Sequence, residues 1–423
     1  MAGVKWNVLD GRARLADPSS SARVRRVFTR VARRSIKAMA TPGIAAAGAS
    51  GIFGLPRGAV RASDALAQGA ATGLRGRRID LSEPQRALLA LGAGDSCPET
   101  QPVTTWVTIL DDPAGTFAFS HNLVADHRHR ILFPWEVDDD GKPVRFRDLR
   151  VSWTRLPRPR RVAGSVAYLS NSGVQNFGHW LLSVFPLVQH YREYLGCDPD
   201  WYYVGTPAES WHYDSLATLG IDPERVLTDA VTGDRMVAAI VDRPIPPPTS
   251  FLDFSTTVLR RPRDDSKTGR RIYISRRLRP TRPFLNEEAC LEVLEGHGCE
   301  PVCTETLTLR EETELFADAE VVVAVHGAGL TNLLFCHPGC AVVELFPHGY
   351  PSPWFVEVSA VRGIIYANLR GLPTNKAGLR PRHYHLLIDP GRLNEVVGAA
   401  ISASRDHQRH VDSLVGRGAS DAD

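Results

Sequence analysis

Hydrophobic residues in the last third of the chain occur in short unbroken runs that alternate with helical patterns. Residues 321–325 (VVVAV) form one run and residues 341–346 (AVVELF) another, as in parallel strands buried on both faces. Helix-start signals stand between such runs, including a capping box from Thr308 to Glu311 and an expected cap at Asn286. Further strands are predicted at residues 271–275, 301–304, 364–369 and 384–388, and helices at 286–296, 330–335, 354–362 and 392–404. This alternation predicts a doubly wound parallel sheet with right-handed crossovers.

The pattern between residues 81 and 263 predicts a first α/β domain. Apolar runs predict strands at residues 103–109, 130–134, 165–170, 201–205 and 236–242. Leu181, Val184, Phe185 and Val188 fall at the i, i+3, i+4 and i+7 positions of a helix, which Pro186 is expected to bend. The remaining predictions are a helix near residues 211–219, a turn at the proline-rich residues 244–248, and a linker at 260–267.

The amino-terminal 80 residues follow neither pattern. Residues 1–78 hold fifteen Lys and Arg against three Asp and Glu, so the basicity of a chain with net charge +3 is local. Residues 21–37 space apolar side chains near helical intervals among arginines, which predicts contact with an anionic membrane surface; a disordered basic extension and a twin-arginine export signal are the alternatives. The expected organisation is an extension over residues 1–80, domains at 81–263 and 264–406, and a flexible tail at 407–423.

The seven cysteines indicate a reducing compartment. An odd number, with spacings such as Cys299 to Cys303 and Cys336 to Cys340, matches no disulfide framework of a secreted domain. The two Cys-x3-Cys pairs have the spacing of zinc ligands, but one cysteine falls beside a predicted strand and another inside a predicted helix, so no metal site is expected. The predicted localisation is cytoplasmic, peripheral to the inner face of the membrane if residues 21–37 bind there.

Candidate chemistry gathers at the ends of strands in the second predicted domain. The strand at 321–325 runs into residues 326–329 (HGAG) and a predicted helix, which favours phosphate because amide groups and the helix dipole face the turn. Glu344, near the carboxyl end of the next strand, is placed to accept the hydroxyls of a ribose. Arg276 and Arg277 follow the first strand of this domain, and strand alternation favours Arg276 for the cleft.

Four motifs between residues 165 and 346 stand in a recognisable order. They are Asn176-x-Gly-His179-Trp180, Tyr273-x-Ser275-Arg276-Arg277 with Asn286-Glu287, His326-Gly-Ala-Gly329-Leu-x-Asn332, and the strand with Val-Glu344-Leu. In order and spacing they resemble the family 61 glycosyltransferases, which include plant β-1,2-xylosyltransferases, eukaryotic protein O-linked N-acetylglucosaminyltransferases and many bacterial capsule or exopolysaccharide proteins. The resemblance implies a GT-B architecture, in which two Rossmann-like domains face a cleft and the carboxyl-terminal one holds most of the nucleotide sugar.

The resemblance further implies an inverting transfer of a hexosyl or pentosyl group to an acceptor hydroxyl. Such a reaction needs a base and a cation-rich cradle for the departing diphosphate. His179 is the favoured base because it lies in the first domain, opposite the donor, and His326 is its competitor. No divalent metal and no cofactor beyond the nucleotide-sugar donor are expected. The predicted donor-binding residues are Arg276, Arg277, His326, Gly327, Ala328, Gly329, Asn332 and Glu344.

The expected acceptor is a glycan of a capsule, exopolysaccharide or lipopolysaccharide, or a lipid-linked sugar. Two alternatives are a non-catalytic nucleotide- or glycan-binding protein and a polysaccharide pyruvyl transferase on the same scaffold. An oxidoreductase is disfavoured because no Gly-x-Gly-x-x-Gly turn follows the first strand of the second domain. Nucleic acid is not an expected partner, since the basic segment lacks interleaved aromatic residues. Each candidate site residue also has a purely structural interpretation. His179 would then be a helix-cap or core residue, Arg276 and Arg277 would belong to a solvated face, and Glu344 would pair with a neighbouring arginine.

Overall fold

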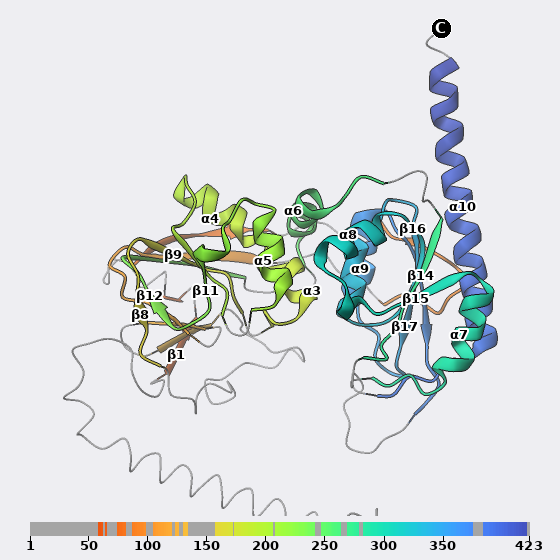
Figure 1. Cartoon of the computed structure of the whole chain (residues 1–423), viewed down its shortest axis with the longest axis horizontal. Coiled ribbons are helices and arrows are strands. Elements are labelled where there is room, and N and C mark those ends of the chain that lie inside the picture. The colour runs from red at the N-terminus through yellow and green to blue at the C-terminus, as the bar shows by residue number, and fades with distance from the viewer. Residues whose placement is uncertain are drawn as a thin grey trace, which may run out of the picture. The chain divides into compact units, whose positions relative to one another are not determined.

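The structure is a computed structural model, and the residues it describes are 58–61, 64–65, 74–81, 87–98, 105–120, 123–126, 130–133, 157–171, 173–205, 208–241, 247–263, 269–278, 282–374 and 384–420. All of them belong to one compact unit, Ile52–Asp423. They form a mixed α/β fold with three six-stranded sheets (Figure 1), in agreement with the predicted α/β class. None of the helices in these ranges is both long and apolar enough to cross a bilayer. The predicted membrane-surface segment, residues 21–37, lies outside the described residues.

The carboxyl-terminal sheet is parallel, with its strands in the order β15-β14-β16-β17-β18-β3. Strands β14 to β18 follow the doubly wound order 2-1-3-4-5, whose topological switch point lies between β14 and β16. The predicted parallel sheet is confirmed, and the switch point is where such sheets bind ligands. The strands are β14 (Arg270–Ile274), β15 (Cys299–Val302), β16 (Ala319–Val325), β17 (Ala341–Phe346), β18 (Ile365–Arg370) and β3 (Leu89–Ala90), the last contributed from inside the predicted first domain.

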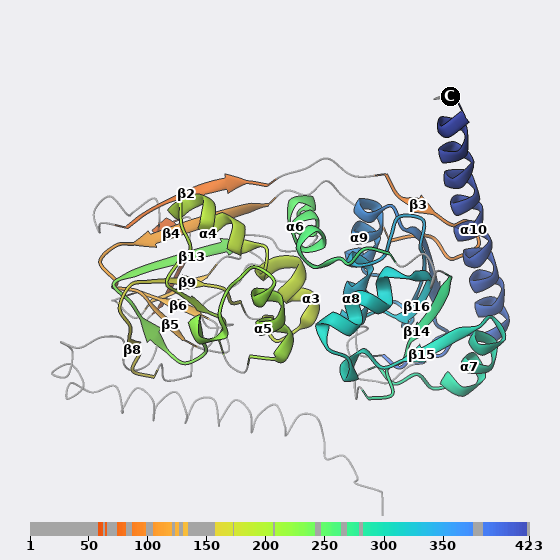
Figure 2. The same cartoon turned by 45° about the horizontal axis from the view of Figure 1, so that its top comes forward.

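The two faces of this sheet bury different side chains. Tyr273, Val321 and Val323 pack with α7 and α10 on one face, whereas Ile272 and Val322 pack with α8 and α9 on the other. Figure 2 shows helices on both sides of the strands. Since both faces are covered, these strands appear in the sequence as unbroken apolar runs. The helices are α7 (Glu287–Gly296), α8 (Leu309–Ala317), α9 (Trp354–Arg362) and α10 (Pro390–Ser420).

A second sheet of mixed direction has the order β11-β10-β9-β13-β4-β2. Its parallel part, β11-β10-β9-β13, has the order 3-2-1-4, so the winding reverses between β9 and β13. Strands β4 and β2 continue the sheet in antiparallel pairs. The strands are β2 (Arg75–Asp80), β4 (Trp106–Asp112), β9 (Ser165–Tyr168), β10 (Trp201–Tyr203), β11 (Val226–Leu227) and β13 (Arg235–Val241).

The chain enters an interrupted helix after β9. The side chain of Asn176 accepts hydrogen bonds from the amides of Gly178 and His179 at the start of α3 (Phe177–His179). A π-helical turn, η5 (Trp180–Val184), comes next, and α4 (Leu187–Leu195) begins after Pro186. Because proline lacks an N–H group, it cannot continue the helical bonding, and the regular helix is interrupted at Pro186.

A third sheet consists of strands of two to four residues in the order β1-β7-β6-β5-β12-β8. The ring of Phe119 packs 5.0 Å from that of Tyr168 and 5.7 Å from that of Tyr203, which joins this sheet to the second one. The strands are β1 (Gly58–Arg61), β5 (Ala118–Ser120), β6 (Leu123–Ala125), β7 (Arg130–Phe133), β8 (Arg160–Arg161) and β12 (Val231–Thr232). Three further short helices are α5 (Ser210–Ala217), η6 (Pro223–Arg225) and η8 (Thr304–Thr306).

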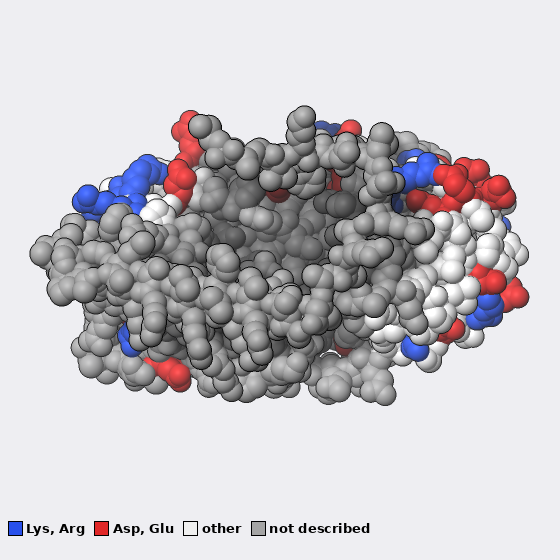
Figure 3. Space-filling model, turned by 90° about the horizontal axis from the view of Figure 1, so that it is seen from below, with Lys and Arg blue, Asp and Glu red and all other residues white. Residues whose placement is uncertain are grey.

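The folded region begins earlier and ends later than the sequence pattern predicts. Strands β1 and β2 fall within residues 1–80, where the sequence pattern predicts no strand. Arginines on the edge strand β2 concealed its strand pattern. One of them, Arg78, packs on an aromatic ring, with its Cζ 4.0 Å from the ring centre of Trp106. Helix α10 continues to Ser420, past the tail predicted from residue 407. Residues 384–388, predicted as a strand, form only an isolated bridge at Leu386. On the face that Figure 3 shows, the Lys and Arg side chains among the described residues lie beside Asp and Glu side chains.

The carboxyl-terminal sheet and the second, mixed sheet have the longer strands and are called here the two larger sheets. Helix α6 (Thr249–Leu259), which the sequence pattern does not predict, joins them (Figure 2). Ser255 Oγ donates to the carbonyl of Leu181 in η5 at 2.6 Å, and Thr256 Oγ1 donates at 3.4 Å to the carbonyl of Leu334 in the 3₁₀ helix η9 (Ala328–Leu334). Phe251 is fully buried in a core cluster that extends from β4 through α6 to β16. A single continuous core therefore spans both larger sheets.

Replacing Phe251 with Ala is expected to lower the free energy of unfolding by about 3–5 kcal/mol, because it leaves a cavity in this shared core. Thr257→Ala, on the exposed side of the same helix, is the matched control and should change it by less than about 0.5 kcal/mol. Urea denaturation followed by tryptophan fluorescence measures both. Equal losses in the two variants would contradict the placement of α6.

Candidate functional site

The carboxyl ends of β14 and β16 bring Arg276 to the peptide that comes after His326. A Cβ atom added to Gly327 would lie 2.5 Å from Nη1 of Arg276 and 3.4 Å from Nη1 of Arg282. The backbone of Gly327 is extended, with φ 164° and ψ 179°, a conformation open to any residue. A side chain at this position would therefore have to displace the guanidinium group of Arg276, whereas the backbone conformation itself does not require the glycine that the sequence predicts for a sharp turn.

The helix predicted after the glycines is a 3₁₀ helix, η9, of only seven residues. A helix this short has a weaker dipole than a full α-helix, and the guanidinium groups of Arg276 and Arg282 add positive charge at the turn. Phosphate binding by this turn stays a prediction. A Cβ atom added to Gly329 would lie 3.1 Å from Cγ2 of Ile274. Gly329 is therefore a packing position under the turn.

A buried chain of hydrogen bonds fixes the imidazole of His326. Its Nδ1 lies 2.6 Å from Oε1 of Glu344, and the hydroxyl of Tyr366 donates to Oε2 of the same carboxylate at 2.6 Å. Glu344 is fully buried and His326 is 6% exposed. Both oxygens of Glu344 are engaged, so the predicted ribose contact does not fit this geometry. Glu344 instead orients His326, and Tyr366 on β18 is a site residue that the sequence did not single out.

Three aromatic rings enclose the imidazole of His326. Ring centres lie 5.1 Å away for Phe346, 5.5 Å for Tyr350 and 5.6 Å for Phe355. The carbonyl oxygen of His326 accepts a hydrogen bond from Arg282, whose Cζ is 5.8 Å from the ring centre of Tyr350. Since Nδ1 is held by a carboxylate, Nε2 is the imidazole nitrogen that can serve a reactant.

His179 approaches the same region from the second sheet. Its ring lies edge-on to that of Trp354 at 5.2 Å, and Trp354 precedes Phe355, which contacts His326. A Cβ atom added to Gly173 would lie 2.8 Å from Cγ of His179, so the loop after β9 also closes on this ring. The two candidate catalytic histidines therefore flank the first turn of α9.

The two glycine-containing motifs are in contact through α3 and η9. A Cβ atom added to Gly178 would lie 2.9 Å from Oγ1 of Thr331 and 3.9 Å from Cα of Ala328. A larger residue here would press against the side chain of Thr331. The structure thus brings together the first and third motifs, which lie about 150 residues apart in the sequence.

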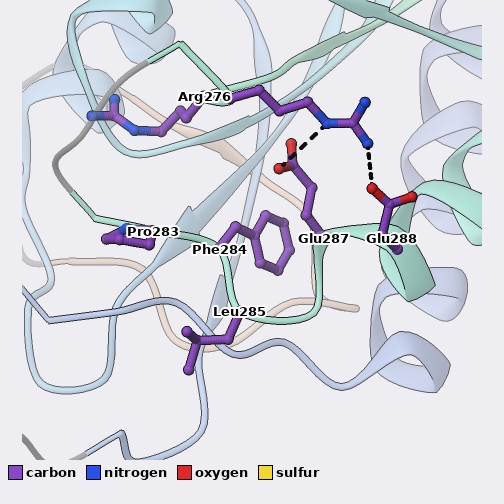
Figure 4. A pocket seen from close by; sticks show the side chains of 7 residues that line it. Arg276, Pro283, Phe284, Leu285, Glu287 and Glu288 are labelled. Atoms are coloured by element: carbon purple, nitrogen blue, oxygen red, sulfur yellow. Dashed lines mark hydrogen bonds and ion pairs between the residues drawn. The ribbon is translucent and has the colours of Figure 1, made fainter. Parts of the chain in front are cut away.

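Arg277 turns away from Gly327. Its Nη2 lies 2.8 Å from Oε1 of Glu288, and its Nε lies 3.8 Å from Oε2 of Glu287. Arg276 and Arg277 diverge, as strand alternation predicts, and the predicted place of Arg277 in the diphosphate cradle does not fit this geometry. Figure 4 shows the surface pocket on this side, which is lined by Arg276, Arg277, Pro283, Phe284, Leu285, Glu287 and Glu288.

Several motif residues have structural roles. The hydroxyls of Tyr273 and Ser275 both donate to Oε1 of Glu287, at 2.8 and 2.9 Å. Asn286 stands at the N-cap position of α7, but its side chain does not cap the helix as predicted; it exchanges hydrogen bonds of 2.7 and 3.1 Å with the backbone of Ile388. These bonds fasten the segment between β14 and α7 to the rest of the fold.

Asn332 lies inside the protein rather than at a ligand surface. It is fully buried, its Nδ2 donates to the carbonyl of Gly329 at 3.1 Å, and its side chain is hydrogen-bonded to Glu312 on α8. The predicted contact of Asn332 with the donor does not fit this position, and the residue instead holds η9 in place. Burial raises the pKa of Glu312 to about 8, and the bond to Asn332 opposes part of that rise.

The cysteines and carboxylates provide no metal centre within the described ranges. No group of three or more His, Cys, Asp or Glu side chains there is placed to hold a metal ion. The seven cysteines are free thiols. The zinc considered for the two Cys-x3-Cys pairs therefore has no ligand set among the residues that the structure describes.

These elements define an α/β protein in which arginines and a carboxylate-bound histidine meet at the switch point of a parallel sheet. Residues 177–343 match the family model Glycosyltransferase 61, in agreement with the resemblance that the motifs carry. The "Beta-1,2-xylosyltransferase XYXT1" of Oryza sativa subsp. japonica is 28% identical over 134 residues, which cover 31% of this chain and 26% of the relative. The chain thus matches about a quarter of the length of that relative.

Glu312 is expected to make the stability of the fold depend on pH. Between pH 4.5 and about 8 the folded state keeps a proton that the unfolded state has lost, so rising pH favours unfolding in that window. The loss reaches at most about 5 kcal/mol near pH 8 and is absent well below pH 4.5. Glu312→Gln retains a polar partner for Asn332 without the proton equilibrium, so its unfolding free energy should fall less steeply from pH 5 to pH 8. Equal slopes in urea denaturation across that range would show that Glu312 ionises normally in the fold.

Proposed function

We propose that this chain is an inverting glycosyltransferase that moves a sugar from a nucleoside-diphosphate donor to a hydroxyl group. The observation that carries the proposal is the convergence of Arg276 and Arg282 on Gly327, directly after the carboxylate-bound His326. This point lies at the switch point between β14 and β16, where doubly wound sheets bind ligands. The match to the family model Glycosyltransferase 61 supports the same class of reaction. In this proposal the two larger sheets are the two Rossmann-like domains of a GT-B enzyme.

The reaction exchanges one bond at the anomeric carbon for another. The acceptor oxygen attacks the anomeric carbon while the bond between that carbon and the diphosphate oxygen breaks. The acceptor proton passes to a base, and the diphosphate leaves with the bonding electron pair. Negative charge then builds on the leaving group, where fixed cations stabilise it best. The planar fork of Arg276 matches phosphate oxygens, which suits it to this task.

The two histidines divide the remaining roles. His179 is the proposed base, because it reaches the region from the sheet opposite the arginine-bearing turn, where an acceptor hydroxyl would lie. His326 is the proposed donor-side residue. Glu344 fixes the orientation of its imidazole, which leaves Nε2 as the ring nitrogen that can contact the donor.

Substrates and location are further parts of the proposal. The name of the Oryza relative makes a xylose-carrying nucleotide the first donor to test. The proposed acceptor is a capsule, exopolysaccharide or lipopolysaccharide glycan, or a lipid-linked sugar. A lipid-linked acceptor would suit an enzyme that works in the cytoplasm and contacts the inner face of the membrane through residues 21–37. The roles given to the two histidines and Arg276 do not call for a divalent metal.

The full-length protein should bind one nucleoside diphosphate selectively, in a way that survives EDTA. Thermal shift against uridine, guanosine, cytidine and adenosine diphosphates and their sugars measures this, since a ligand of the native state raises the melting temperature. Gly327→Ala should weaken binding about 10-fold or more, because its Cβ displaces Arg276. Gly296→Ala, at a position with no atom within 4 Å of an added Cβ, is the control.

Other ligands in the same assay decide between the alternatives. Stabilisation by phosphoenolpyruvate, with no response to any diphosphate, would favour a pyruvyl transferase; stabilisation by a dinucleotide alone would favour an oxidoreductase. Selective diphosphate binding without sugar transfer to any glycan acceptor would favour the non-catalytic alternative.

The kinetics of sugar transfer separate the two histidines. His179→Ala should lower kcat by about 10²- to 10⁴-fold, because it removes the proposed base. Glu344→Gln should lower kcat about 10- to 100-fold, because an amide cannot accept hydrogen bonds at both of its positions and fixes the imidazole of His326 less firmly. Release of nucleoside diphosphate in the presence of acceptor measures both. An unchanged kcat in Glu344→Gln would give the buried carboxylate a purely structural role.

A further inference from the structure

We propose that Arg282 is the second arginine of a diphosphate site above Gly327 and binds the second phosphoryl group of the ligand. This inference rests on the proposed function and deepens it, because it names the residue that distinguishes a diphosphate from a single phosphate. The sequence shows Arg282 only as one arginine in a basic stretch. Its contacts in the fold set it apart.

Two cationic groups are directed at one point. The Nη1 atoms of Arg276 and Arg282 lie 2.5 and 3.4 Å from the position that a Cβ on Gly327 would occupy, and both side chains are half-buried. An anion placed at this point is attracted by both guanidinium groups, and more strongly in a half-buried site than in water. A diphosphate presents two phosphoryl groups, each of which matches one guanidinium fork.

Arg282 is held in place before any ligand arrives. It donates a hydrogen bond to the carbonyl oxygen of His326, and its guanidinium carbon lies 5.8 Å from the ring centre of Tyr350. Tyr350 in turn lies edge-on to the imidazole of His326. A side chain fixed in this way loses little conformational freedom on binding, which favours affinity.

The backbone at Arg282 is strained. Arg282 has φ 57°, and among the described residues no other residue except glycines has a positive φ. This left-handed conformation brings Cβ too close to the following carbonyl oxygen. Two backbone hydrogen bonds fix the chain directly after Arg282. The amide of Leu285 donates to the carbonyl of Leu386 at 2.8 Å, and the amide of Leu386 donates to the carbonyl of Pro283 at 2.9 Å. Backbone strain that the surroundings maintain is concentrated at ligand sites.

A nucleoside attached to the diphosphate has a place to extend. Arg276 borders both Gly327 and the pocket of Figure 4, where Pro283 and Phe284, the two residues after Arg282, form part of the wall. The ring of Phe284 offers an apolar surface for a base. The geometry therefore favours the nucleoside diphosphate of the donor over a lipid-linked diphosphate at this point.

Isothermal titration calorimetry on full-length variants tests the assignment. Arg282→Ala should weaken binding of the preferred nucleoside diphosphate about 10- to 100-fold, but that of the matching monophosphate by less than about 3-fold. Arg282→Gly should weaken diphosphate binding as much, because it also lacks the guanidinium while accepting the positive φ. Arg270→Ala is the control: this arginine stands at the other end of β14, ion-paired with Glu300 at 2.7 Å, and its loss should leave the Kd unchanged.

The outcomes separate this inference from the proposed function. Diphosphate binding by the wild type that is equally tight in Arg282→Ala would overturn the inference and leave the proposed function standing. Weak binding in Arg282→Ala with normal binding in Arg282→Gly would show that the backbone matters and the guanidinium does not, which also overturns it. Absence of diphosphate binding by the wild type would overturn both this inference and the proposed function. A polyprenyl diphosphate in detergent that binds more tightly than any nucleoside diphosphate would overturn the assignment to the donor.

Discussion

A carboxylate removed from water inside a parallel sheet needs hydrogen-bond donors for both oxygens, and Glu344 finds them in His326 and Tyr366. The consequences extend outward from the sheet. With its imidazole fixed, His326 donates its amide to the carbonyl of Leu345 at 2.9 Å and accepts Arg282 at its own carbonyl. The position of Gly327, and with it the place where the arginines meet, therefore depends on a charge buried in the neighbouring strand.

The regular parts of the fold could be predicted because their signals are local. β17 and α9 have the bounds expected from an apolar run and an amphipathic stretch, and the divergence of Arg276 and Arg277 follows from strand alternation. Helix α6 escaped prediction because Ser, Thr and Val, which are poor helix formers, occupy residues 255–258 near its end. Strand β2 escaped because an edge strand can carry arginines wherever rings such as that of Trp106 cover them.

The candidate site was harder to predict, since the residues next to a polar side chain in the sequence do not determine whether it is buried. Glu344 and Asn332 were expected to face a ligand, yet both are fully buried and serve as internal hydrogen-bond partners. Arg282 and Tyr366 were not singled out, because the groups they contact lie 44 and 22 residues away in the sequence. Only the folded chain brings these partners together. His179 and His326, by contrast, were recognisable from motifs in which residue type and spacing are both restricted.

The π-helical turn η5 has no side open to solvent. An ordinary amphipathic helical turn leaves part of its surface exposed, whereas all five residues of η5, which come directly after His179, are buried. Any change in the residues that follow His179 is therefore a change in the core as well. Tolerance to variation next to this histidine lies on the amino-terminal side, at exposed positions such as Gln175.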